Sequence, residues 1–305
     1  MSGTFLWTIR GRGCDENSKK LCMMSAPTPD DAVPKDIVKL ANIAREVADA
    51  IATGAQITPF SMRGTPLELD AAYRSVVDLR ALRGGRVIGR KIGFTNRGIW
   101  ARYGVSSPMW GDVLADTYAD LAEKGQSVAL LGLAEPRLEP EIALVLAKAP
   151  HADMDLAELA DCIGWIAPAF EIVQSIYPGW QFDLTDCIVA GALHGRLLLG
   201  PRVSAQSLDL EQLPDITVTL CKNGEMVEDG VGANALDGPI HALAHLVALL
   251  ETDPLNPPLA PGEIVSTGTL TDACRSRQAR LGPPGTGGRS SSKFRYASPE
   301  ACMSA

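Results

Sequence analysis

The chain has 305 residues, of which 46% are hydrophobic and 21% are charged, the composition of a globular protein long enough to bury a sizeable core. Its formal net charge is −8 at pH 7, and its pI is near 5.1. This acidic balance argues against a nucleic-acid binder, which carries a basic footprint, and against a protein that docks on membranes through clustered basic residues.

The front of the chain predicts an irregular extension followed by helices. Residues 1–35 are polar and show no periodicity. Apolar residues then recur at helical spacing over residues 34–54 and 68–85, and a glycine ends each segment. Residues 86–95, "RVIGRKIGFT", predict a short strand interrupted by glycine.

The centre of the chain predicts a mixture of strands and helix. Residues 141–147 and 168–176 are rich in branched side chains and predict strands. Residues 154–165, between them, predict a helix. Residues 216–230 alternate with period two around Asn223-Gly224, which is typical of a β-hairpin.

The remaining segments predict an amphipathic helix over residues 238–251 and a turn that leads into a strand over residues 259–271. Residues 274–305 are rich in Arg, Gly, Ser and Pro, so we expect a disordered or aberrant tail there. One folded domain over residues 36–273 remains. Helices at the front with strands behind predict an α+β fold, because a doubly wound sheet would alternate the two.

The cysteines and the apolar runs indicate a compartment. Seven cysteines are scattered along the chain without a CxxC pair, which argues against a structural zinc site and suits a reducing environment. The apolar stretch near the N-terminus is too short for a signal peptide, and no run reaches the length of a membrane span. We therefore expect a cytoplasmic protein with neither a membrane nor a nucleic acid as its partner.

Acidic residues stand where strands should enter the core. Glu139 and Glu141 are two apart, so on a strand both side chains point to the same face. Glu171 lies among apolar residues in "PAFEIV", where a lone buried carboxylate is costly unless it is paired or binds a metal. Three carboxylates without Cys or His favour a hard cation, Mg²⁺ or Mn²⁺. The alternative is that the first two are solvated charges and the third pairs with an arginine.

Lys91, in "GRKIGFT", is the natural basic partner of these acids. Glycines on either side permit close approach of the backbone. A lysine that faces a metal site could bind a carboxylate or move a proton. The alternative is an ordinary surface lysine.

These segments together resemble a known family. The motifs "GRKIGFTN", "GDVLAD", "PRLEPEIALVL", "PAFEIVQS", "NGE" and "LAPGEIVSTGTLT" occur in this order over roughly residues 38–273. The series resembles the 2-keto-4-pentenoate hydratase and 4-oxalocrotonate decarboxylase family of the fumarylacetoacetate hydrolase superfamily. The resemblance implies a mixed β-roll core with an N-terminal helical portion, a divalent metal, usually Mg²⁺, and a homo-oligomer.

The resemblance also implies the roles of individual residues. The metal ligands of the family match Glu139, Glu141 and Glu171. The active-site lysine matches Lys91. The residues that line the substrate pocket match Gly268 and Thr269.

The chain departs from the family pattern at two places. Met109, in "SSPMWGD", stands where hydratases carry an acidic residue, and Asp112 follows out of register. His194 stands where a small hydroxyl residue is common, and because histidine exchanges protons near neutral pH it is a second catalytic candidate.

The function expected from these features is a Mg²⁺-dependent lyase, a hydratase that adds water to a small 2-hydroxydienoate or 2-oxoenoate such as 2-hydroxypenta-2,4-dienoate. A metal that holds the carboxylate and the C2 oxygen would stabilise the charge that develops there. Decarboxylation of a 4-oxalocrotonate-type acid needs the same arrangement, so it stays an alternative. Another alternative is a non-catalytic relative that serves as an assembly subunit. Hydrolysis of a carbon–carbon bond is disfavoured because no His–Glu pair precedes Glu139.

Overall fold

The computed structural model describes residues 35–64, 66–121, 130–222 and 225–275. The chain divides into two units, residues 1–38 and residues 39–305. In the first unit the structure describes only the beginning of α1, and the second unit holds the other elements. The helices are α1 (Lys35–Thr53), α2 (Leu69–Arg83), α3 (Trp100–Tyr103), α4 (Leu156–Ala160), α5 (Leu184–Val189) and α6 (Pro239–Glu251).

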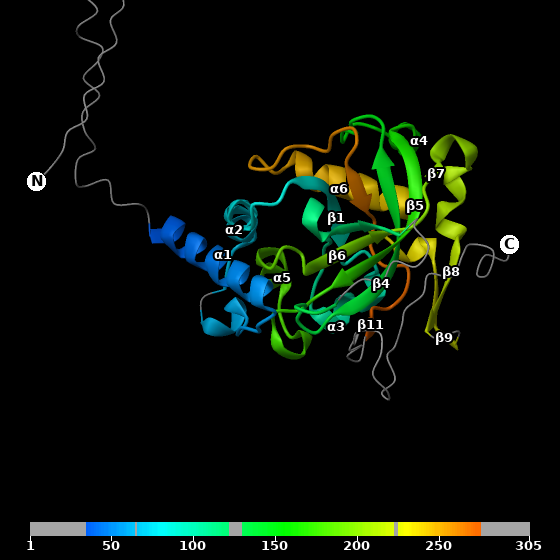
Figure 1. Ribbon diagram of the computed structural model, residues 1–305. Coiled ribbons are helices and arrows are strands. Elements are labelled where there is room, and N and C mark those ends of the chain that lie inside the picture. The colour runs from blue at the N-terminus through cyan, green and yellow to red at the C-terminus, as the bar shows by residue number, and fades with distance from the viewer. Residues whose placement is uncertain (1–34, 65, 122–129, 223–224, 276–305) are drawn as a thin grey trace, which may run out of the picture. The chain divides into compact units, whose positions relative to one another are not determined.

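The strands form one large mixed sheet and a separate hairpin (Figure 1). They are β1 (Val87–Gly93), β2 (Met109–Leu114), β3 (Tyr118–Asp120), β4 (Arg137–Leu146), β5 (Ile163–Val173), β6 (His194–Leu199), β7 (Val203–Ser204), β8 (Thr217–Lys222), β9 (Glu225–Val231), β10 (Ile264–Ser266) and β11 (Cys274–Arg275). The order in the sheet is β2-β1-β10-β4-β5-β6-β3, with β11 on β4 and β7 on β5, while β8 and β9 form the hairpin.

The large sheet is curled and its strands run in both directions. Strands β1 and β10 pair in parallel, as do β3 and β6, and the other pairs are antiparallel. The curl brings β2 into contact with β6, although the two are far apart in the sheet order. The long antiparallel pair of β4 and β5 lies at the centre of the order, and it is this pair that positions the acidic residues.

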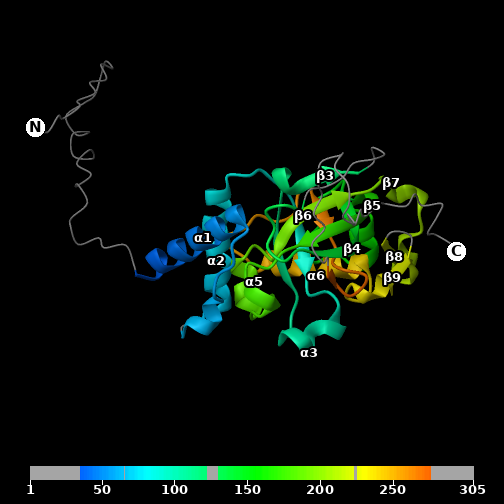
Figure 2. The ribbon, with the colours of Figure 1, turned by 60° about the horizontal axis from the view of Figure 1, so that its bottom comes forward.

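The longer helices α1, α2 and α6 each bury an apolar stripe. In α1, Ile43, Ala44, Val47 and Ala50 are buried, which is the spacing of one helical face. They share a core cluster with residues of α2 and α5, and α2 packs directly against α5. Figures 1 and 2 show α2 and α5 on one side of the sheet and the β8–β9 hairpin on the other.

The two faces of β4 belong to different cores. Leu144 and Leu146 pack into the cluster that contains the apolar face of α6. Ala143 and Val145 point the opposite way, into a cluster with residues of β5, β6 and β10 inside the curl. Because side chains alternate along a strand, Glu141 shares the inner face with Ala143 and Val145. The sheet therefore carries Glu141 into the interior of the curl.

The α+β prediction is confirmed, and most of the expected elements are present. Strand β1 and the hairpin strands β8 and β9 follow the predicted ranges, although the turn at residues 223–224 lies outside the described residues. The helix predicted over residues 154–165 is wrong in its second half. A capping box between Asp155 and Glu158 starts α4, but residues from Ile163 onward join β5, because pairing with β4 outweighs the local helical pattern.

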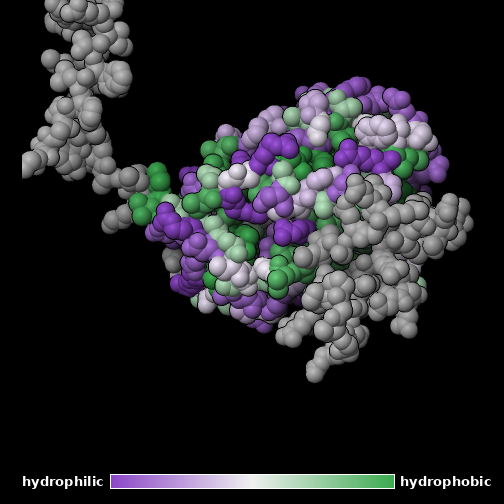
Figure 3. Space-filling model, in the orientation of Figure 1, coloured by the Kyte–Doolittle hydropathy of each residue, from purple (hydrophilic) through white to green (hydrophobic). Residues whose placement is uncertain are grey.

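The expected ends fall largely outside the described residues. Residues 1–34 and 276–305 are not described, and strand β11 begins at Cys274, the first residue of the expected tail. No helix in the described part of the chain combines the length and the apolar character needed to cross a bilayer. Hydrophilic and hydrophobic residues are interspersed on the face shown in Figure 3, as is usual for a folded chain.

Candidate metal centre

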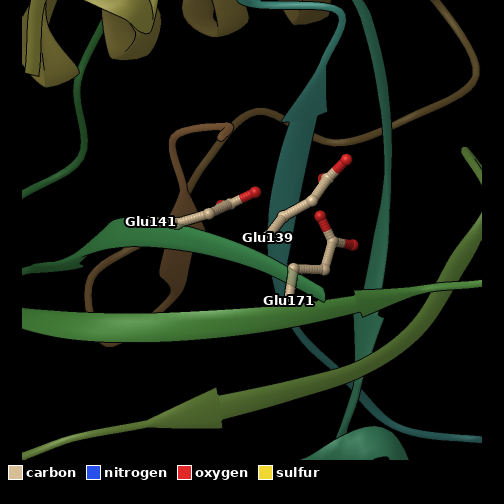
Figure 4. Close-up of side chains that lie close together, drawn as sticks. All are labelled: Glu139, Glu141 and Glu171. Carbon is tan, nitrogen blue, oxygen red and sulfur yellow. The ribbon is translucent and has the colours of Figure 1, made fainter. Parts of the chain in front are cut away.

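Strands β4 and β5 bring the three predicted glutamates together. Glu139 and Glu141 lie on the same face of β4, and Glu171 of β5 is directly opposite Glu139 in the register. One carboxylate oxygen from each residue lies within 4.8 Å of those of the other two. Figure 4 shows the three carboxyl groups directed toward a common space. Like charges directly opposite on a sheet repel, so this arrangement needs a compensating positive charge.

Glu141 is held by the loop that follows β10. Its Oε2 accepts hydrogen bonds from Ser266 Oγ and, at 3.0 Å, from the backbone N–H of Gly268. Its Oε1 is buried and has no hydrogen-bond partner among the residues that the structure describes. A buried carboxylate oxygen without a partner is unusual in a folded protein, and a bound cation is one way to satisfy it.

Glu171 is held from two sides. Lys91 of β1 places Nζ 2.8 Å from Oε2, and His194 of β6 places Nδ1 2.8 Å from Oε1. The other ring nitrogen of His194, Nε2, lies 2.8 Å from Thr117 Oγ1. All these side chains are buried, and His194 lies behind Glu171 and is not among the residues that line the neighbouring pocket. The structure thus places Lys91 and Glu139 in the pocket wall, and His194 on the side of Glu171 that faces away from the pocket.

Burial and mutual repulsion set the protonation of the acids. Burial, reinforced by Glu171, raises the pKa of Glu139 to about 7 against the opposing effect of Lys91. Burial and the nearby Glu171 likewise raise the pKa of Glu141 well above its usual range. Burial works in the same direction on Glu171, but Lys91 and His194 outweigh it and hold its pKa below the ordinary value. Glu171 is therefore ionised, while the other two carboxyls retain protons easily.

Lys91 stays charged despite its burial. Desolvation lowers the pKa of its ammonium, but the three carboxylates outweigh that effect and raise the pKa. When all the groups are ionised, three carboxylates and one ammonium leave two uncompensated negative charges. A divalent cation would balance them. The all-oxygen donor set, the unpartnered oxygen and this charge all fit a hard divalent cation such as Mg²⁺.

A pocket leads from the surface to this cluster. Lys91, Glu139, Gly268 and Thr269 line it, so the structure brings the predicted pocket residues to one place. Gly268 has a φ of +92°, and a Cβ built there would lie 1.8 Å from Thr95 Oγ1, so only glycine fits. The hydroxyl of Thr269 donates to the carbonyl of Thr271 at 2.7 Å, which fixes the Thr269 side chain in the pocket wall.

The two departures from the family pattern occupy different places. Met109 is buried and lines the pocket. Asp112 does not replace an acid there, because it accepts from Arg80 at 2.6 Å and lies 3.2 Å from the Nε of Arg90. Asp112 therefore belongs to a structural ion network between α2 and β1, outside the pocket.

Sequence reasoning did not identify the outer pocket residues. Arg137, Tyr103, Trp180 and Phe182 all line the pocket. Arg137 could have been predicted from the sequence, because it lies two residues before Glu139 and side chains two apart on a strand share a face. The aromatic residues come from loops and short helices distant in sequence, and no local pattern marks them.

Comparison with known proteins gives the relationships of the chain. Residues 119–288 match the family model for the C-terminal domain of fumarylacetoacetate hydrolase. A 2-keto-4-pentenoate hydratase of Burkholderia vietnamiensis is 32% identical over 239 residues, which cover 76% of this chain and 87% of the relative. A 4-oxalocrotonate decarboxylase of a Pseudomonas species is 29% identical over 244 residues, which cover 79% of this chain and 91% of the relative.

A solved structure has the same fold. The 4-oxalocrotonate decarboxylase of Pseudomonas putida G7, complexed with magnesium and adipate, superposes with a TM-score of 0.71 at 24% identity. The match covers 79% of this chain and 90% of that chain. The same enzyme was also solved with calcium and acetate.

Proposed function

The chain belongs to the 2-keto-4-pentenoate hydratase family of the fumarylacetoacetate hydrolase superfamily, and from this premise we propose that it is a Mg²⁺-dependent hydro-lyase. Its substrate is a small 2-hydroxydienoate or 2-oxoenoate, such as 2-hydroxypenta-2,4-dienoate, from the breakdown of aromatic compounds. The observation that carries the proposal is the convergence of Glu139, Glu141 and Glu171 with Lys91, beside a pocket that Glu139 and Lys91 line.

Glu139, Glu141 and Glu171 would hold the cation, Mg²⁺ or Mn²⁺. When bound, the ion would supply a Lewis acid that offsets the negative charge developing on the 2-oxo acid end of the substrate. The hydrogen bond from the Gly268 N–H keeps Glu141 turned toward the same space as the other two acids. The strand register fixes Glu171 opposite Glu139, so the protein supplies a preorganised set of three oxygens.

Lys91 is the proposed catalytic residue. An ammonium has three N–H donors, and Glu171 accepts one of them at 2.8 Å. The others are available to a substrate carboxylate in the pocket, or one proton can pass between Nζ and the substrate during the reaction. Contact with the carboxylate and transfer of a proton predict different kinetics, so a variant can separate them.

His194 is proposed as a positioning residue. It contacts Glu171 and Thr117 and does not line the pocket, so it acts on the substrate only through Glu171. Partners of this kind fix the direction of a ligand carboxylate and tune its basicity. Gly268 and Thr269 shape the pocket wall, and the Thr269 hydroxyl is already engaged by the backbone of Thr271.

The direct experiment follows the loss of dienol absorbance of 2-hydroxypenta-2,4-dienoate with and without Mg²⁺. We expect turnover that disappears with a chelator and returns with Mg²⁺, and that is lost in Glu141→Gln. Turnover that is indifferent to chelation would contradict the proposed centre. No turnover by a protein that binds Mg²⁺ would favour the non-catalytic assembly subunit.

Decarboxylation is a second candidate, because the 4-oxalocrotonate decarboxylase relative aligns with 79% of this chain. Release of CO₂ from 2-oxohex-3-enedioate, measured beside hydration of the dienoate, separates the two reactions. We also propose a homo-oligomer, which light scattering of the purified protein tests directly.

A further inference from the structure

Along the inner face of strand β4 the side chains change from apolar to acidic to basic. Val145 and Ala143 belong to the apolar core, Glu141 and Glu139 follow in the metal centre, and Arg137 comes next at the start of the strand. Residues two apart on a strand are separated by roughly 7 Å. Arg137 therefore lies one such step from Glu139, on the outer side of the carboxylate cluster.

The guanidinium of Arg137 is held in place by aromatic side chains. Its Nη1 donates to the Tyr103 hydroxyl at 2.9 Å, and its Cζ lies 3.8 Å from the ring centroid of Trp180. Tyr103 in turn stacks on Phe182 with the two ring planes at 6°. The Trp180 indole N–H donates to the backbone carbonyl of Glu135 at 3.1 Å, which fixes the Trp180 ring beside the guanidinium. A long side chain clamped in this way binds a ligand without losing much further freedom.

Arg137 has donors to spare. A guanidinium carries five N–H groups, and among the described residues no carboxylate forms an ion pair with Arg137. Arg102 lies at the same end of the pocket and is largely exposed. Its ion pair with Asp272 is long, at 3.7 Å. The outer end of the pocket is therefore positively charged, while the inner end holds the acids.

The separation of the two ends suits a particular ligand. If the 2-oxo acid end binds at the metal centre, a chain of roughly four to six carbons, with bonds of about 1.5 Å, reaches Arg137. A planar guanidinium binds a carboxylate through two parallel N–H donors, a geometry that lysine does not offer. The aromatic rings would flank the carbon chain between the two ends.

We propose that Arg137 is a specificity-determining residue that binds a second carboxylate at the distal end of the substrate. Among the substrates of the proposed reaction, dicarboxylates, meaning 2-hydroxydienoates or 2-oxoenoates that end in a carboxylate, are then preferred over 2-hydroxypenta-2,4-dienoate itself and over substrates that end in an alkyl or aryl group. This inference rests on the proposed function, because it assumes that the 2-oxo acid end lies at the metal centre.

The test compares 2-hydroxyhexa-2,4-dienedioate with 2-hydroxypenta-2,4-dienoate by the loss of dienol absorbance. The wild type should have the higher kcat/KM on the dicarboxylate. Arg137→Gln should lower that value by about 10- to 100-fold, mostly through KM, since a charge-assisted hydrogen bond to the distal end is lost. On the monocarboxylate, which has no distal carboxylate for Arg137 to bind, Arg137→Gln should lower kcat/KM by much less than on the dicarboxylate.

Matched variants separate contact from general charge. Tyr103→Phe keeps the guanidinium but removes its anchor, so it should lower kcat/KM on the dicarboxylate by less than Arg137→Gln does. Arg97→Gln removes a cation that pairs with Asp237 outside the pocket, and it should leave the ratio of the two substrates unchanged. An equal loss in all three variants, or on both substrates, would overturn the proposal.

Two wild-type measurements keep the proposal testable if Arg137→Gln does not fold. A preference of the wild type for the monocarboxylate, or for a dienoate with a distal phenyl group, would overturn it. If neither substrate is turned over with Mg²⁺, the proposed function fails. Calorimetric binding of the saturated 2-oxo diacid and monoacid in the presence of Mg²⁺ then tests Arg137 separately, and equal affinities would reject it.

Discussion

Binding of Mg²⁺ should compete with protons at Glu139. Burial raises the pKa of this carboxyl to about 7 in the metal-free protein, against the opposing charge of Lys91. A cation binds the carboxylate and not the acid, so the proton must leave before the metal is held. Lowering the pH from 8 to 6 therefore weakens the apparent affinity for Mg²⁺ without any change of the fold.

The magnitude follows from this pKa. With a pKa of about 7, roughly ten protonated carboxyls stand for each ionised one at pH 6, and the ratio is reversed at pH 8. The apparent affinity should then be about tenfold weaker at pH 6, a difference of about 1.4 kcal/mol. Glu141 has a pKa raised well above its usual range, so its proton adds to the loss and does not offset it.

The assay is titration calorimetry of Mg²⁺ into metal-free protein at pH 6, 7 and 8. Two buffers with different ionisation enthalpies at each pH report the number of protons released on binding. The control, Glu139→Gln, should bind more weakly at pH 8 and release fewer protons at pH 7. An affinity that is constant from pH 6 to pH 8, with no proton release, would refute the reasoning.

The remaining predictions concern three residues around the centre. Lys91→Ala should lower kcat by about 10²–10⁴-fold if the lysine moves a proton, raise only KM if it binds the carboxylate, and leave both unchanged if it lies outside the site. His194→Ala should weaken the Mg²⁺ affinity by about 10- to 100-fold in a direct titration. His194→Asn should weaken it by less, since an amide N–H can replace Nδ1–H as the donor to Glu171. Equal losses in the two variants would contradict a positioning role. Gly268→Ala should lower both the Mg²⁺ affinity and the melting temperature, because its Cβ would meet Thr95. The control Gly262→Ala, at a glycine with a φ of +87° and open space around it, should lower only the melting temperature. Equal Mg²⁺ affinity in the two variants would contradict this.

Much of the centre follows from local sequence rules, and the rest from the register. Alternation along a strand is enough to place Glu139 and Glu141 on one face. The position of Glu171 opposite Glu139 depends on which residues of β4 and β5 pair, and no local pattern contains that pairing. Lys91 reaches the cluster through β10, with which β1 pairs in parallel, a connection that spans most of the chain.

The place of His194 shows a second limit of sequence reasoning. A histidine next to motif residues suggests a pocket residue, because its chemistry fits one. The structure places it at the start of β6, behind Glu171, where its ring joins that carboxylate to Thr117. Which side of the carboxylate the ring occupies depends on the register in which β6 pairs with β5, and the sequence near His194 does not specify it.

The pocket wall is where local preference and fold disagree most. Phe94, Trp180, Ala192 and Leu193 all line the pocket, and all have positive φ between 56° and 61° although none is glycine. Residues held in sparsely populated backbone regions cost roughly 1–3 kcal/mol each and persist only when the surrounding structure imposes them. Tertiary packing offsets this backbone strain in the pocket wall, which also contains Lys91 and Glu139. Trp180, whose ring contacts the Arg137 guanidinium, is one of these residues, so the position of that ring beside Arg137 depends on tertiary packing and not on local preference.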